Sequence, residues 1–195
     1  MKPASAGIKL TYEDFLLFPN DGKRHEVIDG EHHVTPSPST KHQEVSGNLF
    51  WLLRSYLEAH PCGRIFSAPF DVVFSEFDVV EPDLLYMSHA RAEQVLTAAN
   101  VRGAPELVIE IGSPSTRRRD ETTKRRLYER CGVSEYWVVD PELDVVRVYR
   151  RLGDRFDRPV ELSREAGDTL TTPLLPGMEL ALDRLFTDRS VNWEP

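Results

Sequence analysis

The segment Glu106–Ile111 (ELVIEI) constrains the fold of this chain more than any other. All of its residues except the two glutamates are apolar, and Pro105 and Gly112 bound the run. A strand that is apolar on both faces is typical of the centre of a sheet that helices cover on both sides. We therefore expect a central, doubly covered strand here, with Glu110 near its carboxyl end.

The residues before this strand predict a helix, a hairpin and a second helix. LTYEDFLLFP reads as a short helix that Thr11 caps and Pro19 ends. HEVIDGEHHV reads as a hairpin with an Asp29-Gly30 turn. From His42 to His60, apolar residues recur at helical spacing.

The remaining segments predict a mixed sheet. Strands are expected in RIFSAPFDVVF (64–74), VVEPDLLYM (79–87), EYWVVD (135–140) and VVRVYRR (145–151), and helices over 90–99 and 115–132. The order predicts an α/β (α+β) fold in which helices flank a mixed β-sheet, with an N-terminal helix and hairpin. The length fits a single domain over residues 1–195, with a core of about 10–185.

Composition excludes some classes of protein. The net charge of −8 argues against a general nucleic-acid coat protein, because phosphate neutralisation requires basic residues. Cys62 and Cys131 form no CxxC pair, which excludes a zinc ribbon and a redox motif. No signal-peptide pattern or bilayer-length apolar run is present, so we expect a cytoplasmic protein that does not enter a membrane.

Two carboxylates stand in apolar surroundings. Asp83 follows Pro82 and precedes LLYM, and Glu110 lies within its apolar strand. A buried ionised carboxylate is costly unless it is paired, hydrogen-bonded or bound to a metal. Taken singly, Asp83 also fits a turn residue and Glu110 a salt-bridged strand end. Together on adjacent strands, they would give two hard oxygen ligands for Mg²⁺.

The helix after Glu110 supplies basic groups. Asp120, Lys124 and Tyr128 recur at i, i+4 and i+8 and so form one stripe. The stripe fits either a solvated Asp–Lys pair or a lysine turned toward the end of the sheet. The whole helix is basic and fits either a phosphate-binding face or a solvated surface; its basic residues are Arg117, Arg118, Arg119, Lys124, Arg125, Arg126 and Arg130.

These residues resemble a known family. The matching segments are HEVIDGE, PSPSTKHQ, EPDLLY, ELVIEIGSPST, the D-x-x-x-K-x-x-x-Y helix and GVSEYWVVDP. In this order they are similar to the Uma2 family, a restriction-endonuclease-like branch of the PD-(D/E)XK nuclease superfamily. The resemblance extends roughly from Leu10 to Leu185.

The resemblance implies roles for particular residues. Asp83 and Glu110 match the metal ligands, and Glu26 matches an early glutamate that would be a third ligand. The superfamily lysine two residues after the glutamate is replaced by Gly112, which leaves Lys124 as the lysine of the site. His42 matches a histidine after the Pro-Ser-Pro segment and would be a catalytic residue, either in direct contact with the metal and substrate or supporting the ligands.

Other residues have secondary roles in this interpretation. Glu44 competes with Glu26 as third carboxylate but matches the family pattern less well. Tyr136 and Trp137 are expected in the core. The supporting residues are Ser113, Asp120, Tyr128 and Asp140.

The implied function is that of a metal-dependent endonuclease. It would hydrolyse nucleic-acid phosphodiester bonds, DNA above all, with Mg²⁺ or substituting Mn²⁺, and a homodimer would suit double-strand cleavage. Two alternatives stay open. One is a catalytically weak or inactive nuclease-fold module that binds nucleic acid or a protein partner, and the other is a metal-dependent phosphoesterase acting on small phosphate esters.

Overall fold

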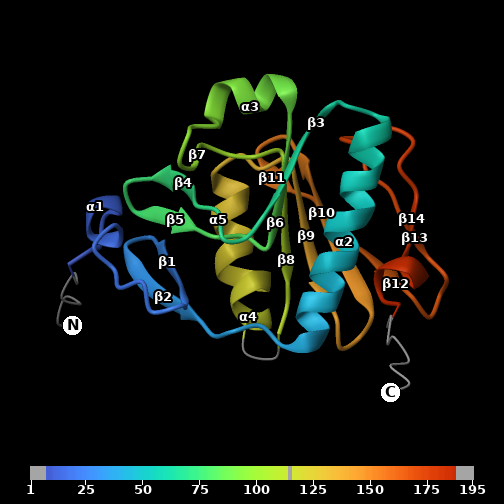
Figure 1. Ribbon diagram of the computed structural model, residues 1–195, viewed down its shortest axis with the longest axis horizontal. Coiled ribbons are helices and arrows are strands. Elements are labelled where there is room, and N and C mark those ends of the chain that lie inside the picture. The colour runs from blue at the N-terminus through green and yellow to red at the C-terminus, as the bar shows by residue number, and fades with distance from the viewer. Residues whose placement is uncertain (1–7, 114–115, 188–195) are drawn as a thin grey trace, which may run out of the picture.

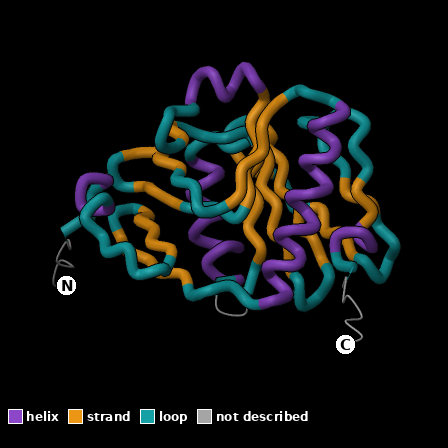
Figure 2. Tube along the Cα trace, viewed as in Figure 1, coloured by secondary structure: helices purple, strands orange, loops and turns teal. Residues whose placement is uncertain are grey.

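The computed structural model describes residues 8–113 and 116–187. A large sheet runs between helix α2 on one side and the α4–α5 helix on the other, and a smaller sheet lies toward the N-terminus (Figure 1). Figure 2 shows the same arrangement by element type. The predicted class, a mixed sheet flanked by helices with an N-terminal helix and hairpin, is confirmed.

The elements follow the chain in an irregular alternation. The helical elements are α1 (Tyr12–Phe15), α2 (Thr40–Ala59), α3 (His89–Val95), α4 (Arg117–Arg119), η1 (Asp120–Lys124), α5 (Arg125–Arg130) and α6 (Leu182–Leu185). The first strands are β1 (Arg24–Ile28), β2 (Glu31–Thr35), β3 (Gly63–Ser67), β4 (Val72–Ser75), β5 (Asp78–Val80), β6 (Leu84–Ser88) and β7 (Val101–Arg102). The later strands are β8 (Leu107–Ile111), β9 (Glu135–Asp140), β10 (Val145–Leu152), β11 (Arg155–Phe156), β12 (Val160–Ser163), β13 (Thr169–Leu170) and β14 (Leu180–Ala181).

Strand β8 lies inside the large sheet, as its apolar sequence predicts. The strand order is β11-β10-β9-β8-β6-β3, and β12 pairs with β10. β8 runs parallel to β9 and antiparallel to β6, which makes the sheet mixed. All five residues of β8 are buried, including Glu110.

Alternation along β8 sends its side chains into two separate cores. Leu107, Ile109 and Ile111 pack in the cluster that contains the apolar face of α2. Val108 packs in the other cluster, with Leu127 of α5. Because successive side chains point to opposite faces of a strand, Glu110 shares the α5 side with Val108. The central strand therefore presents its one carboxylate to the basic helix.

The N-terminal elements form as predicted, with shorter bounds for the helix. The Thr11 side chain caps α1 in a capping box with Asp14, although α1 ends at Phe15. β1 and β2 pair as an antiparallel hairpin, and Asp29 and Gly30 both have positive φ at its turn. This hairpin joins β5, β4 and β7 in the smaller sheet.

Two predicted strands are each divided between the two sheets. The segment 64–74 becomes β3 in the large sheet and β4 in the small one, with Pro69 between them. The segment 79–87 becomes β5 and β6, with Pro82 between them. Proline has no N–H for a strand ladder, so each proline marks where the chain changes sheets. The prediction of one continuous strand in each of these two segments was wrong.

The charged helix after β8 is continuous but not uniform. It passes from α4 through a π-helical segment, η1, to α5, where an unbroken α-helix was expected. The predicted start at Ser115 lies outside the described residues. In residues 8–113 and 116–187, no helix has the length and apolar character needed to cross a bilayer.

Candidate active site

Strand register brings Asp83 and Glu110 together. β6 and β8 are antiparallel, with Leu84 opposite Ile109. Asp83 and Glu110 are each one residue beyond that pair, so the start of β6 meets the carboxyl end of β8. The backbone N–H of Ile111 donates to Asp83 Oδ2 at 2.7 Å, which fixes one carboxylate against the other strand. The predicted convergence at adjacent strand ends is present.

Lys124 reaches this strand end from η1. Its Nζ lies 2.9 Å from Glu110 Oε1 and 2.7 Å from Glu26 Oε1, and its side chain is 3% exposed. The hydroxyl of Tyr128, one helical turn further, donates to the same Glu110 oxygen at 2.5 Å. The sequence allowed the stripe of Asp120, Lys124 and Tyr128 to face either solvent or the sheet. In the structure it faces the sheet. The π-helical turn that carries Lys124 is a geometry often associated with functional sites.

Glu26 enters from the smaller sheet. It lies on β1, is 1% exposed, and its Oε1 also accepts from the backbone N–H of Glu81 at 3.1 Å. Its Oε2 is buried and accepts no hydrogen bond from the described residues, although Arg119 Nη2 lies 3.6 Å away. The site is therefore built where the two sheets meet, which no single segment of sequence reveals.

His42 is a residue of α2 that contacts a buried carboxylate of the site, that of Asp83. It stands in the first turn of α2, where the Ser39 side chain accepts from its backbone N–H. Its Nε2 lies 3.2 Å from Asp83 Oδ2. Ser39 fixes the backbone of the first helical turn, and the contact between the ring and the carboxylate places His42 to orient Asp83.

Burial and charge shift the pKa values of these groups in opposite directions. Burial raises the pKa of Glu110 to about 8 against the attraction of Lys124, and the neighbouring carboxylates add to the rise. Asp83 is also buried, but the hydrogen bond from His42 and the charge of Arg24 lower its pKa below the ordinary value. The carboxylates around Lys124 raise its pKa despite burial, so it remains an ammonium ion.

The donor chemistry of this cluster fits a hard divalent cation. Carboxylate oxygens are the ligands that Mg²⁺ and Mn²⁺ prefer, and Glu26 has a buried oxygen without a hydrogen bond. Among the described residues, no three His, Cys, Asp or Glu side chains are already arranged around a metal position. Lys124 Nζ contacts one oxygen each of Glu26 and Glu110, so a metal that bound these oxygens would compete with the ammonium group.

Sequence reasoning missed two arginines of the site. Arg24 Nη1 lies 2.6 Å from Asp83 Oδ1, and Arg119 Nη2 donates to Thr35 Oγ1 at 2.8 Å beside Glu26. A signal for Arg24 was available, since it precedes Glu26 by two residues on a strand and must share its face. Arg119 lies in a run of three arginines, where periodicity does not separate inward from outward residues.

The other candidates fall into distinct places. Glu44 is exposed on α2, so Glu26 is the glutamate that joins the cluster. Asp120 is buried next to Lys124, and Ser113 contacts Thr116 at the start of the helix. Asp140 lies outside the cluster, where it pairs with Arg117 and caps a turn. Tyr136 and Trp137 are fully buried, as expected of core residues.

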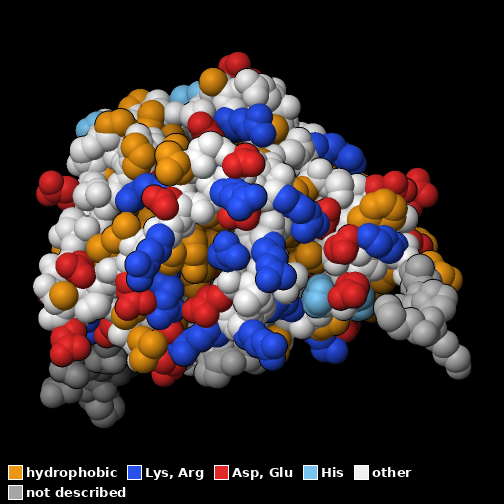
Figure 3. Space-filling model, turned by 180° about the vertical axis from the view of Figure 1, so that it is seen from behind, with side chains coloured by type: hydrophobic (Ala, Val, Ile, Leu, Met, Phe, Trp, Pro, Cys, Tyr) orange, Lys and Arg blue, Asp and Glu red, His pale blue; other side chains and the backbone are white. Residues whose placement is uncertain are grey.

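The basic helix divides its charge between the site and the surface. Lys124 and Arg119 turn inward, and Arg118 and Arg126 are exposed. Arg117, Arg125 and Arg130 each pair with a carboxylate, namely Asp140, Glu129 and Asp78. The rear of the molecule shows many Lys and Arg side chains interleaved with acidic ones (Figure 3). This face is therefore mixed in charge rather than uniformly basic.

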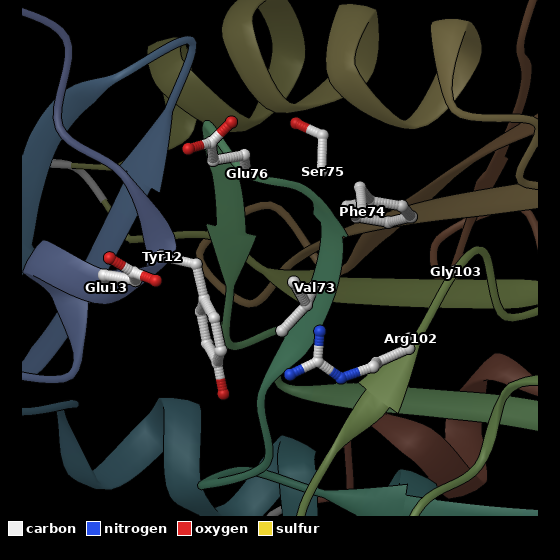
Figure 4. A pocket seen from close by; sticks show the side chains of 8 residues that line it. All are labelled: Tyr12, Glu13, Val73, Phe74, Ser75, Glu76, Arg102 and Gly103. Carbon is white, nitrogen blue, oxygen red and sulfur yellow. The ribbon is translucent and has the colours of Figure 1, made fainter.

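Two cavities differ in their relation to the site. One of about 430 Å³ is lined by Asp83, His42 and Arg24. Another of about 520 Å³ shares no residue with the site; Figure 4 shows the side chains that line it, from Tyr12 to Arg102. Of these two cavities, the first opens onto the site at Asp83.

A mixed sheet with buried carboxylates and a lysine at one strand end is the arrangement expected from the resemblance to restriction-endonuclease-like proteins. Residues 12–183 match the Uma2 family, described as "Putative restriction endonuclease", and the chain belongs to that family. This membership supports nuclease activity as the general class of function.

A solved structure has a similar fold. It is titled a "putative nuclease belonging to DUF820" from Anabaena variabilis ATCC 29413, and its TM-score is 0.76 at 21% identity. The similarity covers 91% of this chain and 97% of that one. Among curated proteins, none matches this chain.

Proposed function

We propose that this chain is a Mg²⁺-dependent endonuclease that hydrolyses phosphodiester bonds of DNA, with Mn²⁺ as a substitute metal. The observation that carries the proposal is that Glu110 and Glu26 converge on Lys124 where the two sheets meet, with Asp83 held at the adjacent strand end. Membership of a nuclease family supports the reaction class. The carboxylate chemistry supports a hard divalent cation.

Each residue has a role in this proposal. Asp83, Glu110 and Glu26 would hold the metal, which would polarise the phosphate and acidify water. The Lys124 ammonium would orient the attacking water or stabilise the extra negative charge that develops on the phosphate. His42 would hold Asp83 in place, and Tyr128 would hold Glu110.

Formal charge also favours a bound cation. The buried cluster contains four carboxylates against three permanent cations: Glu26, Asp83, Glu110 and Asp120 with Arg24, Arg119 and Lys124. When Glu110 loses the proton that it holds near neutral pH, all four carboxylates are ionised and one negative charge is in excess in a setting of low dielectric, where uncompensated charge is costly. A divalent cation would relieve this excess.

Cleavage assays test the proposal directly. The purified chain is incubated with duplex DNA, RNA and a small phosphate ester, each with Mg²⁺, with Mn²⁺ or with EDTA. We expect metal-dependent cleavage of DNA that Asp83→Ala and Lys124→Ala abolish. Lys9→Ala is the matched control, because Lys9 pairs with Asp29 on the surface. Undiminished cleavage by folded Asp83→Ala protein would refute the assignment.

Two alternatives give different results in the same assays. A nuclease-fold module without turnover would bind nucleic acid or a protein partner and take up no Mg²⁺ in a calorimetric titration. A small-molecule phosphoesterase would hydrolyse the ester and spare both polymers. For the nuclease we further propose a homodimer, since cutting both strands of a duplex needs two sites, and light scattering measures this. The free thiols of Cys62 and Cys131 suit the cytoplasmic setting that we propose.

A further inference from the structure

The two oxygens of Asp83 are held in different ways. Oδ2 accepts a hydrogen bond from the backbone N–H of Ile111 at the end of β8, and it contacts His42 in the first turn of α2. Oδ1 is held by Arg24 Nη1 at 2.6 Å. One oxygen is thus fixed by the fold, and the other is paired with a long cationic side chain. A metal that bound Asp83 through Oδ1 would compete with that side chain.

The positive charge of Arg24 interacts with all three proposed metal ligands. The pKa of its guanidinium is raised, against burial, by the charges of Asp83, Glu110 and Glu26. Its side chain is 22% exposed and comes from the first residue of β1, directly after an exposed turn. Arg24 therefore neutralises the site in the absence of metal, and it has solvent on one side into which it could turn.

The cavity beside Arg24 combines charged side chains with the start of a helix. Its charged lining residues are Lys23, Arg24, Glu81 and Asp83, and the start of α2, with His42 and Gln43, also lines it. The first turn of this 20-residue helix has no acidic residue of its own, so its N-terminal end favours a negative charge nearby. His42 lines the same space, is 7% exposed, and has a buried Nδ1 without a hydrogen bond among the described residues. With a divalent cation on Asp83, the basic side chains of the cavity and the helix end would favour an anion there.

We propose that Arg24 takes the place of the metal at Asp83 Oδ1 and, when a divalent ion binds there, turns into the cavity to contact a phosphate of the nucleic-acid strand. This inference rests on the proposed function. It makes Arg24 a residue that lowers metal affinity in the free protein and raises substrate affinity in the metal-bound protein. A guanidinium suits the second task, because its forked donors match phosphate geometry.

Calorimetric titration with Mg²⁺ alone tests the first half. Arg24→Gln removes the competing charge, so we expect it to bind Mg²⁺ about tenfold more tightly than the unmodified chain. Arg117→Gln is the matched control, since Arg117 makes a 2.6 Å contact with the buried Asp140 outside the site. It should leave Mg²⁺ affinity unchanged. A merely structural role for Arg24 would weaken Mg²⁺ binding on its removal.

Steady-state cleavage of a labelled DNA duplex at saturating Mg²⁺ tests the second half. We expect Arg24→Gln to raise KM about tenfold or more, while Arg117→Gln leaves KM as it was. Arg24→Lys, which keeps the charge, should restore Mg²⁺ affinity to that of the unmodified chain and serves if the glutamine variant does not fold.

The outcomes separate this inference from the proposed function. Absence of Mg²⁺ binding by the unmodified chain would overturn both. Mg²⁺ binding that Arg24→Gln weakens or leaves unchanged would overturn the inference about Arg24 alone, and so would an unchanged KM.

Discussion

Lys124 and Glu110 are 14 residues apart, on a helix and a strand, yet Nζ and Oε1 are 2.9 Å apart and both side chains are buried. The contact follows from β8, whose alternation turns Glu110 toward the helix, and from η1, which turns Lys124 toward the strand. Glu26 then approaches the same ammonium from the other sheet. Lys124 therefore contacts both carboxylates in the metal-free protein, and Arg119 Nη2 lies 3.6 Å from the second oxygen of Glu26.

Lys124→Met should therefore cost stability as well as activity. Removing one partner of a buried ion pair leaves charge uncompensated, and we expect the free energy of unfolding to fall by about 3–5 kcal/mol. Saturating Mg²⁺ should recover part of that loss, because the metal neutralises Glu26 and Glu110 in place of the ammonium. Urea denaturation with and without Mg²⁺ measures both effects. A stability equal to that of the unmodified chain would show that the pair is not buried as described.

The sequence predicted the parts of this site better than their assembly. Apolar periodicity located β8 and α2, and the resemblance to a family singled out Glu26 and His42. What it did not predict was that Pro69 and Pro82 send successive strands into two sheets. The meeting of those sheets is a long-range packing outcome, for which local propensity carries no signal. For the same reason the inward turn of Arg119, in a run of three arginines, was not predicted.

Metal affinity should rise with pH. Burial and the neighbouring carboxylates raise the pKa of Glu110 to about 8, so near neutral pH this group holds a proton that a metal must displace. We expect Mg²⁺ to bind more tightly as pH rises from about 6 to 9. Calorimetry in buffers of different ionisation enthalpy would detect the released proton. Glu110→Gln should remove both the proton release and most of the binding.

The raised pKa of Glu110 also determines whether the stability of the metal-free protein rises or falls with pH. A carboxyl group whose pKa is raised by folding stabilises the protonated native state, so its contribution is present below about pH 4.5 and is lost as pH rises through about 8. The metal-free protein should accordingly lose stability over that range. Thermal unfolding of the chain and of Glu110→Gln isolates this group, and equal pH dependence in both proteins would contradict the assignment.

Glu26 and Glu44 provide a direct comparison between the two candidate third carboxylates. Glu26→Gln should lower Mg²⁺ affinity by about tenfold or more and reduce cleavage strongly, because Glu26 lies in the cluster. Glu44→Gln changes an exposed residue of α2 and should alter stability by less than about 0.5 kcal/mol, with cleavage intact. Parallel calorimetry and cleavage assays decide the matter. Loss of cleavage in Glu44→Gln alone would reverse the assignment.

Substitutions at Tyr128 and Tyr136 would distinguish a residue that supports the site from one that packs in the core. Both rings are fully buried and each hydroxyl donates one hydrogen bond, to Glu110 Oε1 for Tyr128 and to the backbone carbonyl of Asp120 for Tyr136. Replacement by phenylalanine keeps the ring in each case and should cost about 1–2 kcal/mol of stability.

The two variants should differ in metal binding, since Tyr128 orients a proposed ligand. Loss of such an orienting bond typically lowers metal affinity by about 10–100-fold. We expect Tyr128→Phe to show that loss together with slower cleavage, and Tyr136→Phe to retain the metal affinity of the unmodified chain. Mg²⁺ titration of the two proteins at matched folded fraction measures the difference. Equal affinities would mean that the Tyr128 hydroxyl serves packing and leaves Glu110 free to orient itself.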